Sequence, residues 1–326
     1  MASTVMRRIG IDPTYQGVAS AMGAGALWGL VFLAPELARA FTPLELAIGR
    51  YLAYGAIALL LIAPRWSSVT SMLTRRDWLT LGWLGLMGNT VYYILLSKAV
   101  QTGGIAMTTI IIGFIPVTIT VIGSLERGAV RLSALAPSLA LCAAGAACIG
   151  WQAFNGSASD SGGSSLIGFL CAIGALASWT AFAVTNSRSL GRLKRVSVHD
   201  WSLLTGLSAG AQALLLLPIA ILAGSLRHDA DGWIQFASVS IGVALLASIA
   251  GNALWNRTSR LLPLTLSGQL ILFETMFGLL YAFTWEQRLP TMFEILAFMF
   301  LIAGVTSCLA AHRQPAGRAD ISAPSH

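Results

Sequence analysis

The sequence predicts an all-α polytopic membrane protein with ten transmembrane helices, arranged as two inverted five-helix repeats around a central cavity. Three observations predict it: a strongly apolar composition, ten apolar runs of spanning length, and matching motifs in the two halves. Of the 326 residues, 56% are hydrophobic and only 10% are charged. A soluble domain carries about 25% charged residues, so this chain belongs in a lipid bilayer.

A helix needs about 20 largely apolar residues to cross the hydrocarbon core. The runs that meet this requirement are Gly17–Pro35, Pro43–Ala63, Trp78–Val100, Ile105–Leu125, Leu132–Trp151, Ser165–Asn186, Trp201–Ala223, Trp233–Asn256, Pro263–Thr284 and Thr291–Ala311. The connections are too short and polar to bury a core of their own, so no soluble domain is expected.

The chain therefore divides into two repeats with short flanking segments. The expected divisions are a cytoplasmic N-terminal segment (1–16), a first five-helix repeat (17–151), an extracytoplasmic linker (152–164), a second five-helix repeat (165–311) and a cytoplasmic tail (312–326). A cleaved signal peptide is the alternative for the first run, because Arg7 and Arg8 precede it and small residues follow it. We interpret it as a retained helix, since it is longer than a usual signal segment and has a counterpart in the second half.

The basic residues predict the orientation. With a cytoplasmic N-terminus, 15 of the 20 Lys and Arg residues fall on the cytoplasmic side, four on the other side, and Arg50 within a span. Positive charge is retained in the cytoplasm, so both termini are expected there. The net charge of +7 and the pI near 9.7 then reflect orientation, and we expect no binding to nucleic acid.

Histidine and cysteine argue against metal chemistry. The four histidines fall in connections or the tail, and the four cysteines lie in apolar runs without metal-binding spacing. The phosphate-binding pattern G-x-x-x-x-G-K-[ST] is also absent from the sequence. We therefore expect no cofactor and no metal, and any energy for activity must come from a gradient or from downhill flow of the substrate.

Three motif pairs recur in the same order in the two halves. Gly and Trp stand eleven residues apart in the first and sixth runs, and a Gly-Asn-x-x-aromatic pattern occurs in the third and eighth. A Glu just after the fourth and ninth runs is followed by a Gly 19 and 18 residues later. The pairs are Gly17/Trp28 with Gly168/Trp179, Gly88/Asn89/Tyr92 with Gly251/Asn252/Trp255, and Glu126/Gly145 with Glu286/Gly304. Five helices per half make the repeats inverted, an arrangement typical of transporters with a site at the bilayer midplane.

These features resemble the EamA-type transporters of the drug/metabolite transporter superfamily. The resemblance spans Gly17 to Ala311 and rests on the following residues: Trp28-Gly29, Arg50, Pro116 with Glu126, and Phe273-Glu274 with Glu286. It implies a ten-helix transporter whose first, third, fourth, sixth, eighth and ninth helices line the cavity. Family members often have proline after the ninth-helix glutamate, but here Thr275 follows, so a proline kink is not expected there.

Glu274 is the deepest carboxylate in the predicted spans, ten residues from either end of the ninth run. A charge at the bilayer centre costs about 2.5–3.5 kcal/mol on insertion scales, so it should face protein or water. Glu274 either binds a cationic group or a proton in the cavity, or is a structural residue, for example paired with Arg50.

Arg50 and Glu45 form a second candidate pair, for an ion pair or a gate. Arg50 either meets a substrate carboxylate or extends toward the interface and pairs with Glu45, five residues earlier. We favour the structural role for Arg50. Glu45 and Glu294 lie within one turn of span ends, where solvation at the interface explains them.

Polar and aromatic residues at helical spacing mark the inward faces, because amides and hydroxyls would be unsatisfied in lipid. Besides Glu274, the predicted substrate-binding residues are Trp28, Asn89, Tyr92, Tyr93, Thr109, Trp179, Asn252 and Trp255. For Trp28, Tyr92 and Trp179, plain packing is an equally good explanation. The glycine pairs Gly25/Gly29 and Gly206/Gly210 are typical of close helix contacts.

Such a cavity suits a small amphipathic metabolite with an amine near Glu274 and an apolar part against the aromatic rings. By resemblance, the best match is export of neutral or aromatic amino acids, and the alternative is efflux of drugs or cationic metabolites. No cluster of Arg or Lys is expected in the cavity, which argues against phosphorylated substrates. A membrane-embedded transferase is the alternative from another class. The sequence lacks the acidic or histidine clusters that such an enzyme would need. The expected partners are a small-molecule substrate and the lipid bilayer, and no particular oligomeric state is predicted.

Overall fold

The computed structural model describes residues 13–123, 132–155, 162–193, 195–223, 228–262 and 270–313. The helices are α2 (Pro13–Leu37), α3 (Pro43–Ile62), the 3₁₀-helix η1 (Ala63–Arg65), α4 (Trp66–Thr70), α5 (Arg75–Gly85), the π-helix η2 (Leu86–Val91), α6 (Tyr92–Gly103), α7 (Ile105–Ile112), α8 (Ile115–Gly123), α9 (Leu132–Asn155), α10 (Gly162–Arg192), α11 (Val198–Leu222), α12 (Ala230–Val243), the π-helix η4 (Ala244–Gly251), α13 (Asn252–Leu261), α15 (Leu272–Glu286) and α16 (Met292–Arg313). The described residues contain no strand, and the predicted all-α polytopic class is confirmed.

Eight helical stretches among the described residues are long and apolar enough to cross a membrane, and Met292–Cys308 in α16 is a shorter apolar helix. With α15, these elements account for the ten predicted runs. Residues 263–269, at the start of the ninth run, lie outside the described residues, as do Glu126 and Asp160.

Three of the predicted spans are composite helices. The third passes from α5 through η2 into α6, and the eighth passes from α12 through η4 into α13. The fourth is interrupted between α7 and α8, at Gly113 and Phe114. Pro116 explains this break, because it lacks an N–H and its ring would clash with the carbonyl four residues earlier.

Several helices begin with a capping box, in which a hydroxyl and an acid three residues later satisfy each other's backbone N–H. In α3, the Thr42 hydroxyl accepts from the Glu45 N–H, and the Glu45 carboxylate accepts from the Thr42 N–H at 2.7 Å. Thr74 and Asp77 do the same at the start of α5. Glu45 and Asp77 therefore cap the N-terminal ends of α3 and α5.

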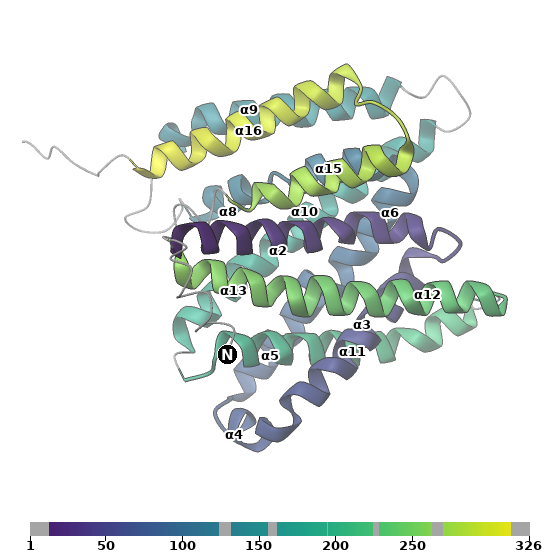
Figure 1. The fold of residues 1–326 in the computed structure, drawn as a ribbon, viewed down its shortest axis with the longest axis vertical. Helices are drawn as coiled ribbons and strands as arrows, with labels where there is room; N and C mark the ends of the chain where they lie inside the picture. The colour runs from purple at the N-terminus through teal and green to yellow at the C-terminus, as the bar shows by residue number, and fades with distance from the viewer. Residues whose placement is uncertain are drawn as a thin grey trace, which may run out of the picture.

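The helices pack as an elongated bundle (Figure 1). The α3·α11 pair lies toward one end, the α9·α16 pair lies at the other, and α2, α15, α13, α6 and α10 lie between them. Glycine permits the closest of these contacts. A Cβ at Gly210 of α11 would lie 2.8 Å from Gly55 Cα in α3, and a Cβ at Gly25 of α2 would lie 2.7 Å from Phe273 Cβ. The predicted role of these glycines in close helix packing is confirmed.

The helix contacts of the two halves correspond. α6 of the third span packs on α10 of the sixth, and α13 of the eighth packs on α2 of the first. α5 packs on α11, and its counterpart α12 packs on α3. These two pairs of contacts are therefore preserved when the first five spans are exchanged with the last five.

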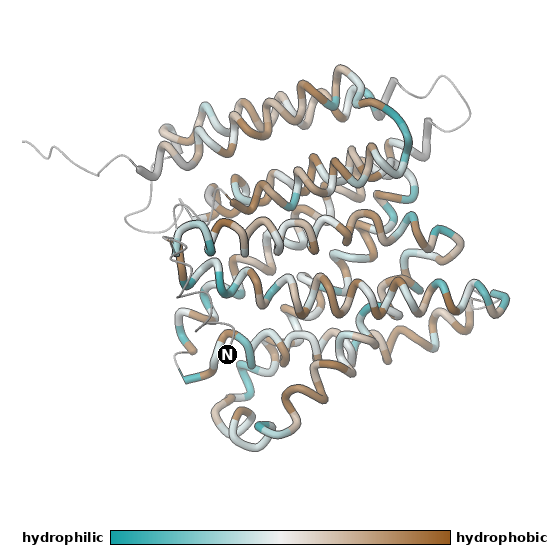
Figure 2. Tube along the Cα trace, in the orientation of Figure 1, coloured by the Kyte–Doolittle hydropathy of each residue, from teal (hydrophilic) through white to brown (hydrophobic). Residues whose placement is uncertain are grey.

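Hydrophobic residues occupy the middle of most helices, and many hydrophilic residues gather at the turns on the two sides of the bundle (Figure 2). Large apolar side chains also face outward: Leu60 is 74% exposed and Leu215 is 76% exposed. An apolar outer surface of this extent is the surface that lipid covers.

Candidate functional site

A cavity of about 1050 Å³ lies inside the bundle. It receives side chains from the first, second, third, sixth, seventh, eighth and ninth spans. Its lining residues are Trp28, Val31, Arg50, Tyr54, Arg65, Gly88, Asn89, Tyr92, Trp179, Phe182, Asn186, Leu190, Val196, Ser197, Val198, His199, Ser202, Thr205, Ala247, Ser248, Asn252, Trp255, Asn256, Ser259, Arg260, Ile271 and Glu274.

Most of the predicted site residues come together in this lining. They are Trp28, Asn89, Tyr92, Trp179, Asn252, Trp255 and Glu274, together with Arg50 from the proposed ion pair or gate. They come from six different spans, so the fold gathers residues that are far apart in sequence around one space. Whether these side chains contact a substrate stays a prediction.

Two predicted site residues, Tyr93 and Thr109, do not line the cavity. Tyr93 is buried against α3, where its ring lies 4.3 Å from the Arg50 guanidinium carbon. Adjacent helical residues point about 100° apart, so Tyr92 and Tyr93 cannot share a face. Thr109 is fully buried in α7, and a Cβ at Gly278 of α15 would lie 2.8 Å from its methyl group. Close packing of α7 on α15 therefore excludes it from the cavity.

The expected pairing of Arg50 with Glu45 is wrong. One Glu45 oxygen accepts from the N–H and the hydroxyl of Thr42, at 2.7 and 2.8 Å, and the other lies 3.4 Å from Nε2 of His228. Glu45 is 1% exposed, so interfacial solvation does not explain it. Its carboxylate is used at the start of α3, five residues from Arg50 and on another side of the helix.

Glu294 needs the same correction. It is 3% exposed, and it accepts from the Thr291 N–H at 2.7 Å and forms an ion pair with Arg288 at 2.6 Å. The hydrogen bonds that Arg288 donates to Glu294 raise the pKa of Arg288, which lies in the connection between α15 and α16. Glu286 is the last residue of α15 and also contacts Arg288 at 2.7 Å.

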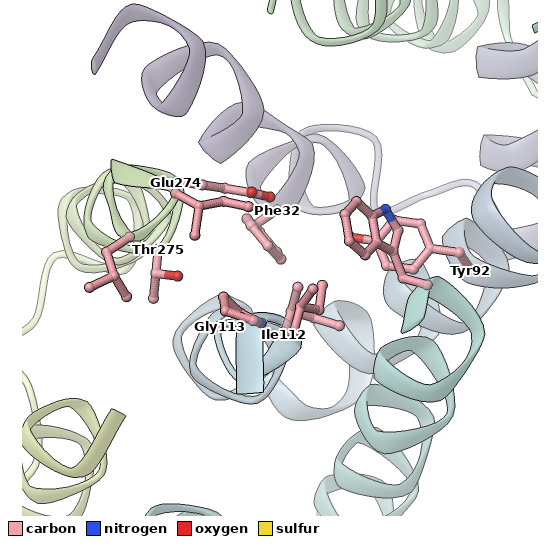
Figure 3. A pocket seen from close by; sticks show the side chains of 11 residues that line it. Phe32, Tyr92, Ile112, Gly113, Glu274 and Thr275 are labelled. Atoms are coloured by element: carbon pink, nitrogen blue, oxygen red, sulfur yellow. The ribbon is translucent and has the colours of Figure 1, made fainter. Parts of the chain in front are cut away.

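Glu274 lies in the first turn of α15, where its N–H donates to the Ile271 carbonyl at 3.1 Å. The N-terminal end of a helix carries partial positive charge, which favours a carboxylate there. A second pocket of about 30 Å³ adjoins it, lined also by Phe32, Gly113 and Thr275 (Figure 3). Glu274 and Tyr92 line both spaces, so the carboxylate stands where the large cavity meets the small one.

The third span contributes its π-helix to the cavity wall. A π-helix widens the backbone and leaves carbonyl groups free for other donors. In η2, the Met87 carbonyl accepts from the Ser178 hydroxyl of α10 at 2.7 Å. A Cβ at Gly88 would lie 2.2 Å from the Phe182 ring, so only glycine lets α10 approach this segment.

The eighth span repeats this arrangement with different donors. In η4, the Ala247 carbonyl accepts from Nε1 of Trp28 in α2 at 3.1 Å. A Cβ at Gly251 would lie 2.7 Å from that same nitrogen. The repeated Gly-Asn-x-x-aromatic pattern thus begins inside η2 in the third span and at the last residue of η4, Gly251, in the eighth. Periodicity alone did not predict either π-helix.

Two aromatic clusters face the cavity. The ring centroids of Trp28 and Trp255 are 5.3 Å apart, and those of Trp179 and Phe182 are 5.6 Å apart. One cluster joins the first and eighth spans, and the other lies on the sixth. Such surfaces suit an apolar or aromatic ligand part.

The cavity reaches one side of the bundle, at residues from helix ends and connections. Arg65 follows α3, His199 lies in the first turn of α11, and Arg260 is in the last turn of α13. Three arginines line the cavity in all: Arg50, Arg65 and Arg260. They are dispersed, with Arg65 paired to Asp200 at 2.9 Å.

The opposite side of the bundle is held together by hydrogen bonds and aromatic contacts. Gln101 donates to the Phe41 carbonyl at 2.9 Å, and Gln235 donates to the Leu37 carbonyl at 2.6 Å. The Phe41 ring stacks on Phe236, with centroids 4.4 Å apart. These contacts join the first, second, third and eighth spans beyond the cavity.

The second and seventh spans line the cavity although they were not predicted to do so. Tyr54, Ser202 and Thr205 belong to them, and the Tyr54 hydroxyl donates to the Ser202 carbonyl at 2.9 Å. The polar residues of these two spans are isolated in apolar runs. They therefore form no pattern at helical spacing that would have predicted an inward face. The fourth span contributes Gly113 and Pro116 to the small pocket instead.

Within the described ranges, no group of three or more His, Cys, Asp or Glu side chains is placed to hold a metal ion. The cysteines of these ranges form no disulfide, and Cys308 is buried. The chemistry of the site therefore comes from one carboxylate, a few arginines, amides, hydroxyls and aromatic rings.

Helices of membrane-spanning length around an internal polar cavity define the class: a polytopic membrane protein built to admit a small molecule. Known proteins agree with this class. The EamA-like transporter family model matches residues 15–151. The inner membrane protein YtfF of Escherichia coli (strain K12) is 34% identical over 310 residues, which cover 89% of this chain and 93% of YtfF.

One solved crystal structure has the same fold, with a TM-score of 0.59 and 19% sequence identity, covering 91% of this chain and 99% of that one. The chain belongs to the EamA-like transporter family. It is an integral inner membrane protein and a membrane transporter.

Proposed function

We propose that this protein is a secondary transporter that exports small amphipathic metabolites, with neutral or aromatic amino acids as the best fit. The observation that carries the proposal is the cavity of about 1050 Å³, in which aromatic rings and amides surround the Glu274 carboxylate. A volume of this size admits a single metabolite. The amine of the substrate would approach Glu274, and its apolar part would lie against Trp28, Trp179 or Trp255.

We further propose that transport occurs by alternating access between two inverted repeats, residues 17–151 and 165–311. The corresponding helix contacts and the two π-helices at matching places in the halves support this relation. The cavity reaches the side of the connections after α3, α10 and α13, which the basic residues predict to be cytoplasmic. In that orientation the structure corresponds to the state that loads substrate from the cytoplasm.

Efflux of drugs or cationic metabolites is the second candidate. Glu274 favours it, because a carboxylate beside aromatic rings also suits an amine without a carboxylate. The cation Arg50 in the same lining opposes it. The two candidates therefore differ in the charge of the molecule that the cavity holds.

A transport assay in liposomes tests the proposed function. Purified protein is reconstituted, and uptake and release of labelled phenylalanine, leucine and phenethylamine are followed with and without a proton gradient. We expect protein-dependent movement of the amino acids, unchanged as judged by mass spectrometry. Movement of the amine alone would favour cation efflux, a modified product would indicate an enzyme, and no movement of any of them would contradict the proposal.

A further inference from the structure

Arg50 is a buried cation in the cavity wall. It lies in α3 and is 8% exposed, and it lines the cavity that also contains Glu274. Its Nε and Nη1 atoms are buried without a hydrogen-bond partner in the part of the chain that the structure describes. Buried charges are normally paired or hydrogen-bonded, since desolvation is costly. Arg50 therefore has donors available for a group that enters the cavity.

Neither nearby acid neutralises Arg50. Glu45 is engaged by Thr42 and lies 3.4 Å from His228. Glu274 shares the cavity lining, yet the two described side chains form no ion pair with each other. The cavity thus presents a cation and an anion as separate groups.

Aromatic rings hold the guanidinium in place. Its central carbon lies 4.3 Å from the Tyr93 ring centroid and 5.4 Å from that of Tyr51. These two rings pack edge to face, with centroids 5.9 Å apart. Cation–π contacts compensate part of the desolvation, while Nε and Nη1 have no hydrogen-bond partner among the described residues. Tyr51 and Tyr93 are therefore positioning residues for the guanidinium.

We propose that Arg50 is the binding site for the carboxylate of the substrate, so that the cavity selects zwitterions. A guanidinium presents parallel N–H donors that match the two oxygens of a carboxylate. Arg50, Tyr92 and Glu274 line the same cavity. A molecule with an amine and a carboxylate satisfies both groups at once. This inference rests on the proposed function and narrows its substrate to amino-acid-like molecules.

Three ligands with the same ring and differing in charge test the inference: phenylalanine, phenethylamine and 3-phenylpropionate. Binding to the purified protein in lipid nanodiscs is measured by calorimetry or by tryptophan fluorescence. We expect Arg50→Gln to weaken phenylalanine and 3-phenylpropionate binding at least about tenfold and to leave phenethylamine within about twofold. Arg50→Lys, which keeps the charge and loses the fork, should restore part of the affinity. Arg76→Gln, which removes an exposed arginine of α5, is the matched control and should bind like the unaltered protein.

A measurement on the unaltered protein guards against variants that fail to fold. Phenylglyoxal modifies arginine, and mass spectrometry reports its addition to Arg50. Phenylalanine should protect Arg50 from modification, and phenethylamine should not.

Each contrary result has a distinct meaning. If Arg50→Gln weakens all three ligands equally or none of them, Arg50 is structural and the inference is overturned while the proposed function stands. If phenethylamine alone binds, the carboxylate site is overturned in favour of cation efflux. If none of the three binds and liposomes show no transport, the proposed function fails, and the inference fails with it.

Discussion

At the scale of single residues, the most specific prediction concerns Glu274. It stands in the first turn of α15, where the large cavity meets the small pocket. Glu274→Gln keeps the shape and removes the charge. If the carboxylate holds an amine, the variant should transport phenylalanine with kcat/KM reduced about tenfold or more, as expected for loss of a charged hydrogen bond.

Flux in liposomes and expression level are the two measurements for this variant. Asp231→Asn, at the exposed start of α12, is the matched control and should behave like the unaltered protein. Unchanged flux for Glu274→Gln, together with a lower melting temperature, would make Glu274 a structural residue.

Trp28 and Trp179 occupy matching places in the two halves but differ in bonding. Trp28 donates to the Ala247 carbonyl at 3.1 Å, so it also ties α2 to η4. Trp179 contacts Phe182, with centroids 5.6 Å apart. We expect Trp179→Ala to reduce the preference for phenylalanine over leucine roughly tenfold, the value of one aromatic contact, while Trp28→Ala also lowers thermal stability.

A competition assay with labelled phenylalanine and unlabelled leucine measures this preference, and Trp151→Ala, on a 60% exposed side chain, serves as control. An unaltered preference in Trp179→Ala would show that the ring only packs.

At the scale of elements, the α3·α11 contact depends on Gly210. A Cβ there would lie 2.8 Å from Gly55 Cα, and backbone atoms cannot yield easily. Gly210→Ala should therefore destabilise the protein by about 1–3 kcal/mol. Gly242→Ala is the control, because nothing lies within 4 Å of a Cβ at Gly242, and alanine is the better helix former by about 1 kcal/mol.

Melting temperatures in detergent compare the two variants. The expected order is Gly242→Ala at or above the unaltered protein, and Gly210→Ala clearly below it. Equal melting temperatures would mean that α3 and α11 can separate without cost.

The ten helical runs were predictable, because lipid requires each spanning segment to be long, apolar and internally hydrogen-bonded. The π-helices were not, since one extra residue in a helical turn changes neither composition nor hydropathy. Tyr93 was misplaced because a helical stripe does not say which neighbouring helix covers it. The roles of Glu45 and Glu294 could have been predicted from the Thr-x-x-Glu pattern of a capping box. Their position near span ends instead led to the interpretation that they are solvated at the interface. The environment of Arg50 depends on α6, which no local pattern reveals.

At the scale of the whole molecule, the side of the bundle opposite the cavity mouth must open if access alternates. Leu37 at the end of α2 and Gln235 of α12 meet there through a 2.6 Å hydrogen bond. Leu37→Cys with Gln235→Cys, in a cysteine-free background, should be joined through disulfide bonds by a short bis-methanethiosulfonate cross-linker. We expect transport to stop when the cross-link forms and to return after reduction, as measured in liposomes.

A second cross-link supplies the control. A Cβ at Gly304 of α16 would lie 3.0 Å from the sulfur of Cys142 in α9, so Gly304→Cys can pair with Cys142. This pair lies outside the cavity lining, and we expect transport to continue when it is cross-linked. Transport through the cross-linked Leu37→Cys, Gln235→Cys protein would contradict opening at that side.

A π-helix interrupts both the third and the eighth span beside the cavity. η2 and η4 each offer a carbonyl to a neighbouring helix, but one partner is the Ser178 hydroxyl and the other is the Trp28 indole. Both π-helices share a backbone carbonyl that is bonded by a neighbouring helix. The donor side chain differs between them, so the donor can vary with the transported compound. Replacing the Ser178 and Trp28 donors one at a time would therefore show which of the two hydrogen bonds the fold requires and which one affects the transported compound.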